Sequence, residues 1–403
     1  MREGAHAAPG RATEGYRRLD RGAIRGLVDS LSGSARLRAA AETVVIRAFG
    51  LVVALFLFGV FVKMAGASPA DVFFQMYRGS IGSSFSVQNT LLRAAPLMLT
   101  ALCTAIPARL GLVVIGGEGA MVMGGLAAAA SGLLIKNSSP GIVTVVMVLA
   151  GFCAGGLWIG FAGALRTYRG VSETISSLLL NYIAIALLNQ IVEGPLRDPA
   201  SLNKPSTPNI GEANMLHNIP GMDVHWGLVY GIVACAIAYL LMEHTVFGFG
   251  SSIVGGNLRA GQLCGLPVRR MVVIACALGG GAAGVAGMLE VAAVHGSANA
   301  SLIAGYGYSG ILVSFMARHN PLGILPVAIL LGGIAASKGL LQRVDNLPDA
   351  TVNVLQGILF VVILASETLY GRIPFFKARS RPAAIDATAA PPTAPATTTA
   401  EVP

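Results

Sequence analysis

The sequence has few charged residues and lacks the motifs of several protein classes. Only 12% of its 403 residues are charged, about half the fraction usual in soluble domains. No glycine-rich run continues into Gly-Lys-Ser/Thr, so the chain has no recognisable nucleotide phosphate loop. The six histidines form no H-E-x-x-H pattern, and the five cysteines have neither zinc-site nor C-x-x-C spacing. We therefore expect no enzyme active site, no metal site and no cofactor in this chain.

Apolar residues, by contrast, make up 54% of the chain, and the mean hydropathy is +0.69. A soluble core could not hide so much apolar surface, so lipid must cover much of it. The 51 glycines suit helices that approach each other closely in lipid. Pairs such as Gly280 with Gly284, and Gly151 with Gly155, have the G-x-x-x-G spacing of such contacts. The composition therefore predicts an all-α, polytopic bundle of membrane helices.

About ten segments are apolar enough to be candidate spans, given that a crossing needs roughly 20 mostly apolar residues. The eighth is too short for a full span and is interpreted as a broken helix or part of a re-entrant segment. The ten segments are 45–65, 90–109, 118–135, 142–165, 172–192, 226–243, 271–293, 307–317, 321–340 and 351–371.

The positive charges indicate the orientation. If the N-terminus is placed inside and the spans alternate, 20 of the 28 Lys and Arg residues fall on the cytoplasmic side. Cytoplasmic loops carry such an excess, so we expect both termini to be cytoplasmic. The net charge of +9 is explained by this asymmetry and by attraction to anionic lipid, and indicates no binding of nucleic acid.

The chain divides into a membrane domain and two polar ends. Residues 1–44 form a basic cytoplasmic segment, 45–375 the membrane domain, and 376–403 a Pro-, Ala- and Thr-rich tail without a core to bury. The first apolar stretch begins late and is long, which favours a retained span over a cleaved signal peptide.

Two long loops are predicted, one on each side of the membrane. The external loop, 193–225, holds five prolines and is either a lid or docking surface for an external partner or a plain connector. The cytoplasmic loop, 244–270, contains a short surface helix on which a motor protein could act. Asn257 is its expected cap, Gly265 its left-handed end, and Pro267 prevents its continuation.

Glu118 is the most informative single residue, because an ionisable group between two apolar segments is costly unless it meets a cavity or a partner. The glycines around it, Gly116, Gly117 and Gly119, loosen the helix, and broken helices build midplane sites in transporters. Two interpretations stay open. Glu118 either lines a substrate pathway or lies near an interface and caps the helix that starts at 119.

Two further segments carry polar groups within the apolar regions. A second glycine-interrupted stretch, 305–310, contains Tyr306, Tyr308 and Ser309 and opens a short apolar helix. Such paired breaks in two halves of a chain point to a transporter repeat. Ser177 and Asn181 share one face of the fifth span and bind either a polar ligand or a neighbouring helix.

Five stretches of this chain, in the same order, resemble the permease subunits of ATP-binding cassette (ABC) importers for simple sugars and nucleosides. These belong to the ribose-type and branched-chain amino acid permease superfamily. The resemblance covers roughly 45–375 and includes the Gly-Glu-Gly element, a Gly-Pro-Leu-Arg-Asp-Pro loop and the cytoplasmic loop. Val114, Ala120, Arg259 and Gly261 depart from the family pattern. The matching stretches are 94–125, 170–184, 194–199, 256–266 and 305–323.

The resemblance implies a multi-pass protein of the bacterial inner membrane that moves a small polar solute, a nucleoside or a simple sugar. It implies two cytoplasmic ATP-binding subunits that hydrolyse the ATP, an external binding protein, and a second permease in a heterodimer, with a homodimer left open. The alternative is a secondary transporter that uses Glu118 as its coupling site. The pathway residues implied are Gly116, Glu118, Gly119, Ser177, Asn181, Tyr306, Tyr308 and Ser309, and the ATPase-coupling residues are Asn257, Arg259, Ala260 and Gly265.

Overall fold

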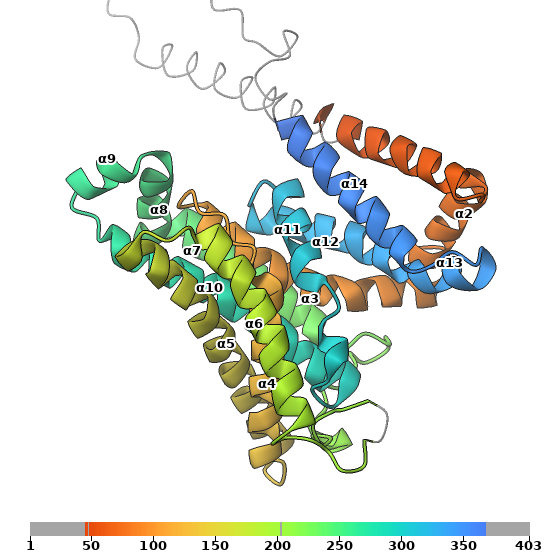
Figure 1. The fold of residues 1–403 in the computed structure, drawn as a ribbon, viewed down its shortest axis with the longest axis horizontal. Helices are drawn as coiled ribbons and strands as arrows, with labels where there is room; N and C mark the ends of the chain where they lie inside the picture. The colour runs from red at the N-terminus through yellow and green to blue at the C-terminus, as the bar shows by residue number, and fades with distance from the viewer. Residues whose placement is uncertain (1–44, 47, 202–203, 368–403) are drawn as a thin grey trace, which may run out of the picture. The chain divides into compact units, whose positions relative to one another are not determined.

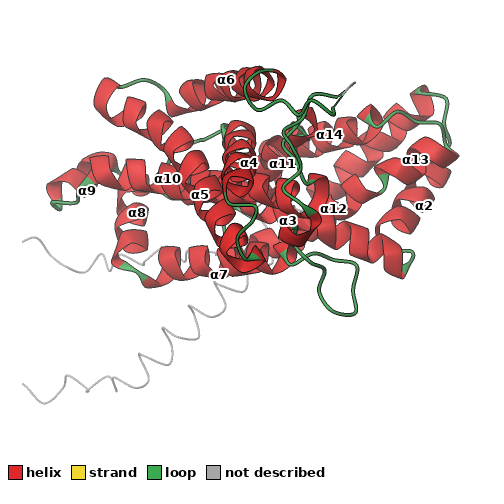
Figure 2. Cartoon of the chain, turned by 90° about the horizontal axis from the view of Figure 1, so that it is seen from below, coloured by secondary structure: helices red, strands yellow, loops and turns green. Residues whose placement is uncertain are grey.

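The computed structural model describes residues 45–46, 48–201 and 204–367. The predicted basic segment and the predicted tail lie outside the described residues. Within the described part the chain is helical (Figure 2). Its extended pairing consists of two isolated bridges, Ser206 with Asn299 and Asn218 with His225. Residues Arg47–Glu367 form one compact unit. The prediction of an all-α membrane bundle is confirmed for this unit.

Most helices follow one another with short connections, and a long loop joins α6 to α7 (Figure 1). A first helix, Ala48–Met64, precedes the labelled ones. The labelled α-helices are α2 Pro69–Ser80, α3 Ser84–Ala108, α4 Gly117–Leu134, α5 Pro140–Ala164, α6 Glu173–Glu193, α7 Gly227–His244, α8 Val246–Gly256, α9 Leu258–Leu263, α10 Val268–Leu289, α11 Tyr306–Met316, α12 Pro321–Ala336, α13 Lys338–Val344 and α14 Ala350–Glu367. Short π segments, η1 Leu165–Arg169 and η3 Glu290–His295, extend α5 and α10, and short 3₁₀ turns are η2 Glu212–Asn214 and η4 Ala300–Leu302.

Seven helices of the described part are long and apolar enough to cross a membrane, or eight if the bent pair at the start counts as one span. The expected number of about ten is therefore not confirmed. The difference lies at predicted segments one, eight and ten. The first bends, and the apolar helices at the other two, Ala300–Met316 and Ala350–Ser366, fall just short of the length required of a span.

The bend follows the helix Ala48–Met64. The axis turns by 120° into α2, which the sequence analysis did not predict. Gly66 lies between the two helices with φ of +86°, a left-handed conformation that glycine adopts at no steric cost. Pro69 then starts α2, where its missing N–H is no loss.

Two helices form the centre of the unit. α10 packs against α3, α4 and α5, and α3 packs in addition against α7, α11 and α12. Glycines permit the closest contacts: a Cβ atom at Gly155 would lie 2.3 Å from the carbonyl oxygen of Gly280. The predicted role of the G-x-x-x-G pairs in close helix packing is thus confirmed.

The outer helices turn large apolar side chains away from this centre. On α5 these include Leu149, Leu157 and Phe161, which are more than half exposed. In water such a surface would be unfavourable, whereas hydrocarbon covers it at no cost. The arrangement is that of a bundle whose rim faces lipid.

Both predicted helix breaks are present. Between α3 and α4 the helix ends at Ala108, a turn follows that contains Gly111 with φ of +76°, and residues 112–115 have no regular structure. Between η3 and α11 it passes through Gly296 and Gly305, with φ of +65° and +80°. α11 has only 11 residues, about 16 Å of helix, which confirms the short helix expected after the second break.

Candidate functional site

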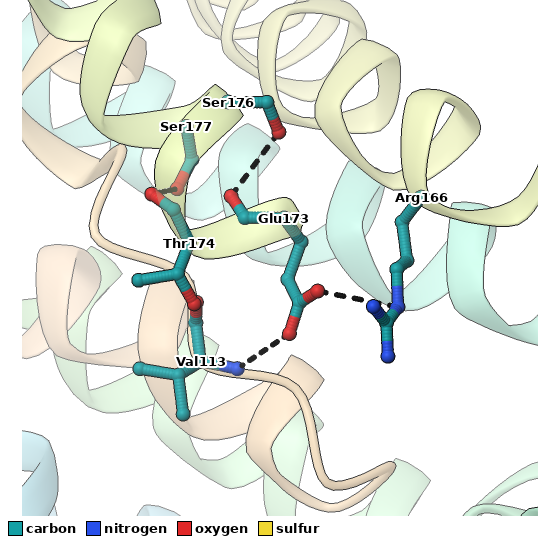
Figure 3. Close-up of polar contacts among 6 residues, drawn as sticks. All are labelled: Val113, Arg166, Glu173, Thr174, Ser176 and Ser177. Carbon is teal, nitrogen blue, oxygen red and sulfur yellow. Dashed lines mark hydrogen bonds and ion pairs between the residues drawn. The ribbon is translucent and has the colours of Figure 1, made fainter. Parts of the chain in front are cut away.

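The break between α3 and α4 is held by a row of polar side chains on α6 (Figure 3). Glu173 accepts a hydrogen bond from the backbone nitrogen of Val113 at 3.4 Å, and the Thr174 hydroxyl donates to the carbonyl oxygen of the same residue at 2.8 Å. One turn further, Ser177 accepts from the backbone nitrogen of Ile115 at 3.1 Å. These side chains replace the helical hydrogen bonds that the broken segment has lost.

Asn181 completes the row at its far end. Its amide nitrogen donates to the carbonyl oxygen of Ile115 at 3.1 Å, and its amide oxygen accepts from the backbone nitrogen of Gly119 at 2.7 Å. The side chain is fully buried, and its nitrogen also lies 3.5 Å from the Tyr308 hydroxyl. Asn181 therefore holds the end of the broken segment and the first turn of α4, and it reaches α11.

The spacing of these four residues explains why the sequence folds this way. Positions 173, 174, 177 and 181 lie on one face of a helix, and non-helical backbone at membrane depth persists only where protein or water satisfies it. Of the two predicted interpretations for Ser177 and Asn181, the structure shows contacts with a neighbouring segment. For Ser177 that segment is broken backbone, and for Asn181 it also includes the first turn of α4.

The role of Glu173 in the first turn of α6 was not predicted. The carboxylate is largely buried, and its second oxygen lies 3.3 Å from Nε of Arg166 in η1 (Figure 3). Arg166 thus joins the end of α5 to the row on α6. The signal in the sequence was the helical spacing of Glu173 with Ser177 and Asn181.

Glu118 joins the two breaks. Its oxygens accept hydrogen bonds from the backbone nitrogens of Gly305 at 2.8 Å and Gly307 at 2.6 Å, and its side chain is fully buried. It therefore caps α11, whereas the sequence analysis considered only the start of its own helix.

The charge of Glu118 has a physical explanation in this geometry. α4 and α11 begin next to each other, and each helix N-terminus carries unpaired N–H groups and a partial positive charge. The Glu118 carboxylate lies in the first turn of α4 and accepts two N–H groups at the start of α11. It therefore compensates the partial positive charges at the N-termini of both helices. The close approach depends on glycine, because a Cβ atom at Gly307 would lie 2.1 Å from the backbone nitrogen of Glu118.

Two of the predicted pathway residues line a cavity of about 610 Å³, which we term the α11–α14 cavity. Tyr308 and Ser309 face it from α11, whereas Gly116, Glu118, Gly119, Ser177 and Asn181 support the breaks behind its wall and Tyr306 faces a different cavity. Polar groups that the sequence analysis missed also line it. They are Lys338, Asn353 and Gln356.

These polar groups are connected across the cavity. The Ser309 hydroxyl donates to the side-chain oxygen of Gln356 at 3.1 Å, and the Lys338 ammonium donates to that of Asn353 at 2.8 Å. Apolar walls with a few oriented polar groups are the usual composition of a small-molecule site, and the volume falls within the roughly 300–1,000 Å³ of such sites.

The short cytoplasmic-loop helix has the predicted geometry. Asn257 accepts hydrogen bonds from the backbone nitrogens of Arg259 and Ala260, at 2.9 and 3.2 Å, and so caps α9. Gly265 follows the helix with φ of +74°, and Leu258 and Leu263 are exposed. The helix α8 precedes it and was not predicted.

The α8–α9 corner touches the start of the first break. A Cβ atom at Gly255 would lie 2.2 Å from the carbonyl oxygen of Arg109, and Gly111 is 3.5 Å from Gly255 by the same measure. This corner therefore packs directly against the start of the broken segment that α6 holds.

These features define a polytopic helical membrane protein with two broken helices that meet at a buried carboxylate. The sequence profile of the family described as "Branched-chain amino acid transport system / permease component" matches residues 86–364. The chain belongs to this family, and it is a permease subunit of an ABC importer, which is a membrane component of a transporter and not an enzyme.

Individual relatives are similar over most of the chain. The glucose ABC transporter permease protein TsgB13 of Haloferax volcanii is 27% identical over 321 residues, which are 77% of this chain and 84% of the relative. The guanosine ABC transporter permease protein NupP of Bacillus subtilis is 26% identical over 322 residues, 76% and 88% of the two chains. The nucleoside ABC transporter permease protein NupB of Lactococcus lactis is 25% identical over 337 residues, which are 80% of this chain and 91% of the relative.

Proposed function

We propose that this permease imports a nucleoside or a simple sugar across the bacterial inner membrane. The observation that supports this most strongly is the family match over 86–364, together with relatives named for glucose, guanosine and nucleosides. An ATP-driven importer accounts for Glu118 better than a secondary transporter does, because each oxygen of its carboxylate accepts a backbone N–H group and Glu118 is not among the residues that line the α11–α14 cavity.

The complete importer, in this proposal, contains two cytoplasmic ATP-binding subunits, an external binding protein and a second permease. ATP is hydrolysed by the partner subunits, since the sequence has no nucleotide phosphate loop. The chain crosses the membrane about ten times with both termini in the cytoplasm, and α14 and the longer segment Ala300–Met316, which contains α11, complete the count. The excess of Lys and Arg on one side supports this orientation.

The solute crosses through the α11–α14 cavity, beside the two breaks. Tyr308 and Ser309 contact it, and Asn181 and Glu118 hold the backbone that forms the wall. The ATPase docks on α9 through Asn257, Arg259, Ala260 and Gly265, and its movement reaches the breaks through the contact of Gly255 with Arg109.

Reconstitution tests the class and the solute together. The permease is reconstituted in proteoliposomes with its ATPase, the second permease and the binding protein. These vesicles should take up radiolabelled guanosine or glucose only when ATP is present on the side of the membrane that carries the ATPase subunits. Uptake by this chain alone, driven by an ion gradient, would contradict the proposal.

The docking site has its own test. The double variant Arg259→Glu with Asn257→Pro removes the positive charge and the cap of α9, so the ATPase should no longer co-purify while the permease stays folded. Arg197→Glu is the matched charge reversal on the exposed external loop and should leave co-purification unchanged.

A further inference from the structure

A second polar cavity lies on the other side of the break before α11. It encloses about 510 Å³ between α3, η3, the 218–225 turn and residues 301–306, and we term it the α3–η3 cavity. Its volume is again within the roughly 300–1,000 Å³ of small-molecule sites. The polar residues around it are Asn89, Arg93, Asn218, Asp223, His225, Glu290, His295 and Ser301.

Two of these residues are charged groups within membrane helices. Arg93 lies nine residues into α3, about 14 Å along its axis, and Glu290 begins η3 at the end of α10 with only 6% of its surface exposed. Such groups are costly in the hydrocarbon region and normally face a cavity or a partner. Glu290 lies 3.6 Å from Nε2 of His295, whereas the buried Nε of Arg93 has no hydrogen-bond partner among the described residues.

The lining indicates the chemistry of the ligand. Arg93 offers donors, Glu290 and Asp223 offer acceptors, and Asn89 and Asn218 offer both. Charges of both signs are present, so the cavity has no strong preference for an anion or a cation. Tyr306 also lines the cavity. Hydroxyl groups, which donate and accept at once, satisfy such a set of groups best.

The segment around Gly305 separates the two cavities. Ala304 lines both of them, Gly305 lines the α11–α14 cavity, and Tyr306 lines the α3–η3 cavity. The Glu118 carboxylate holds this segment through Gly305 and Gly307. A solute in the α3–η3 cavity would therefore reach the α11–α14 cavity only when the segment moves.

We propose that the α3–η3 cavity is a binding site for a neutral polyhydroxylated solute, with Arg93 and Glu290 as its main hydrogen-bonding groups. It receives the solute on the external side before the segment 304–307 opens. The assignment of the external side and of the transported solute rests on the proposed function.

The direct test is protection of a cavity thiol by solute. Ala293→Cys, in a background of Cys153→Ala and Cys264→Ala, places a thiol on the cavity lining of the assembled permease–ATPase complex in nanodiscs. Guanosine, D-glucose and L-leucine are added without binding protein and without ATP, and the rate of maleimide modification is measured. Ser138→Cys, exposed in the turn between α4 and α5, is the control.

Guanosine or glucose should slow modification of the Ala293→Cys thiol by about tenfold at about ten times its dissociation constant, by mass action. The Ser138→Cys thiol should be unaffected, and leucine should not protect. When Arg93→Gln or Glu290→Gln is combined with Ala293→Cys, the solutes should no longer protect the thiol. Should these variants misfold, Ser301→Leu fills the lining without removing a charge and should have the same effect.

The two proposals fail separately. If neither guanosine nor glucose slows modification, or if only leucine does, the cavity is not a site for polyhydroxylated solutes, even if ATP-driven uptake of guanosine is normal. Protection without ATP-driven uptake of either solute by the complete importer would instead overturn the proposed transport and leave the site standing.

Discussion

The Oε2 atom of Glu118 lies 2.6 Å from the backbone nitrogen of Gly307, a residue that follows it by 189 positions. This hydrogen bond joins the first turn of α4 to the first turn of α11, the two helices that begin after breaks. Two positive helix ends would otherwise repel each other in a medium of low dielectric constant. The carboxylate therefore stabilises the place where the two halves of the permease meet.

Glu118→Gln tests this role. The amide keeps the shape but presents an NH₂ group to one of the two backbone N–H groups, which loses its acceptor. We expect the free energy of unfolding to fall by about 1–3 kcal/mol, with a lower thermal midpoint in detergent and reduced uptake. Glu212→Gln, exposed in η2, should change neither. An unchanged midpoint with reduced uptake would show that Glu118 acts on the pathway and not on the helix ends.

Asn181→Leu should loosen the break between α3 and α4. The variant leaves the Gly119 N–H and the Ile115 carbonyl without their partner, which should cost about 2 kcal/mol or more, since each buried unpaired group costs about 1–3 kcal/mol. Hydrogen exchange should rise in a peptide covering 113–120. Asn189→Ala, exposed on the same helix, should leave the exchange of that peptide as it is. Equal exchange in both variants would contradict the role of Asn181.

Gly284→Ala should disrupt the packing of α10 on α5. The new Cβ atom would lie 2.0 Å from the carbonyl oxygen of Gly151, so the helices must separate. Overpacking of this kind typically costs about 1–3 kcal/mol, and the thermal midpoint should fall accordingly. At Gly357 on α14 an added Cβ meets nothing within 4 Å, so Gly357→Ala should keep the midpoint of the wild type or raise it slightly.

His319 predicts a pH dependence of stability. It lies in the turn between α11 and α12, where burial, followed by the charges of Arg109 and Arg318, lowers its pKa to about 4. The folded protein then holds the ring neutral between about pH 6.5 and pH 4, where the unfolded chain binds a proton. Stability should be fully present above the unfolded pKa and fall as the pH drops through this window.

His319→Asn isolates this effect. The residue has φ of +57°, which asparagine tolerates better than most residues, so the turn should be retained. The variant should lose the part of the pH dependence between about 6.5 and 4 in thermal unfolding of the complex. A variant curve parallel to the wild type would mean that His319 does not titrate in this window.

The sequence alone determined several features because they depend on near neighbours. Apolar composition fixed the membrane location, since lipid is the only solvent for so much exposed hydrocarbon. Asn257 and Gly265 marked the ends of α9 because caps and left-handed glycines act over a few residues. The glycines beside Glu118 and around Tyr306 marked both breaks for the same reason. The number of spans was harder to predict from the sequence, because hydropathy does not reveal the 120° bend after Met64.

Only the tertiary structure decided which groups satisfy the breaks. The sequence showed that Glu118 needs a partner and that α6 carries polar residues on one face. It did not show whether these side chains bind a solute, a neighbouring helix or a non-helical part of the chain. Packing placed the N–H groups of Gly305 and Gly307 against the carboxylate, and the backbone of 113–119 against α6. Such partners lie 60 to 189 residues apart, and their choice depends on how helices approach through glycine, which no local pattern specifies.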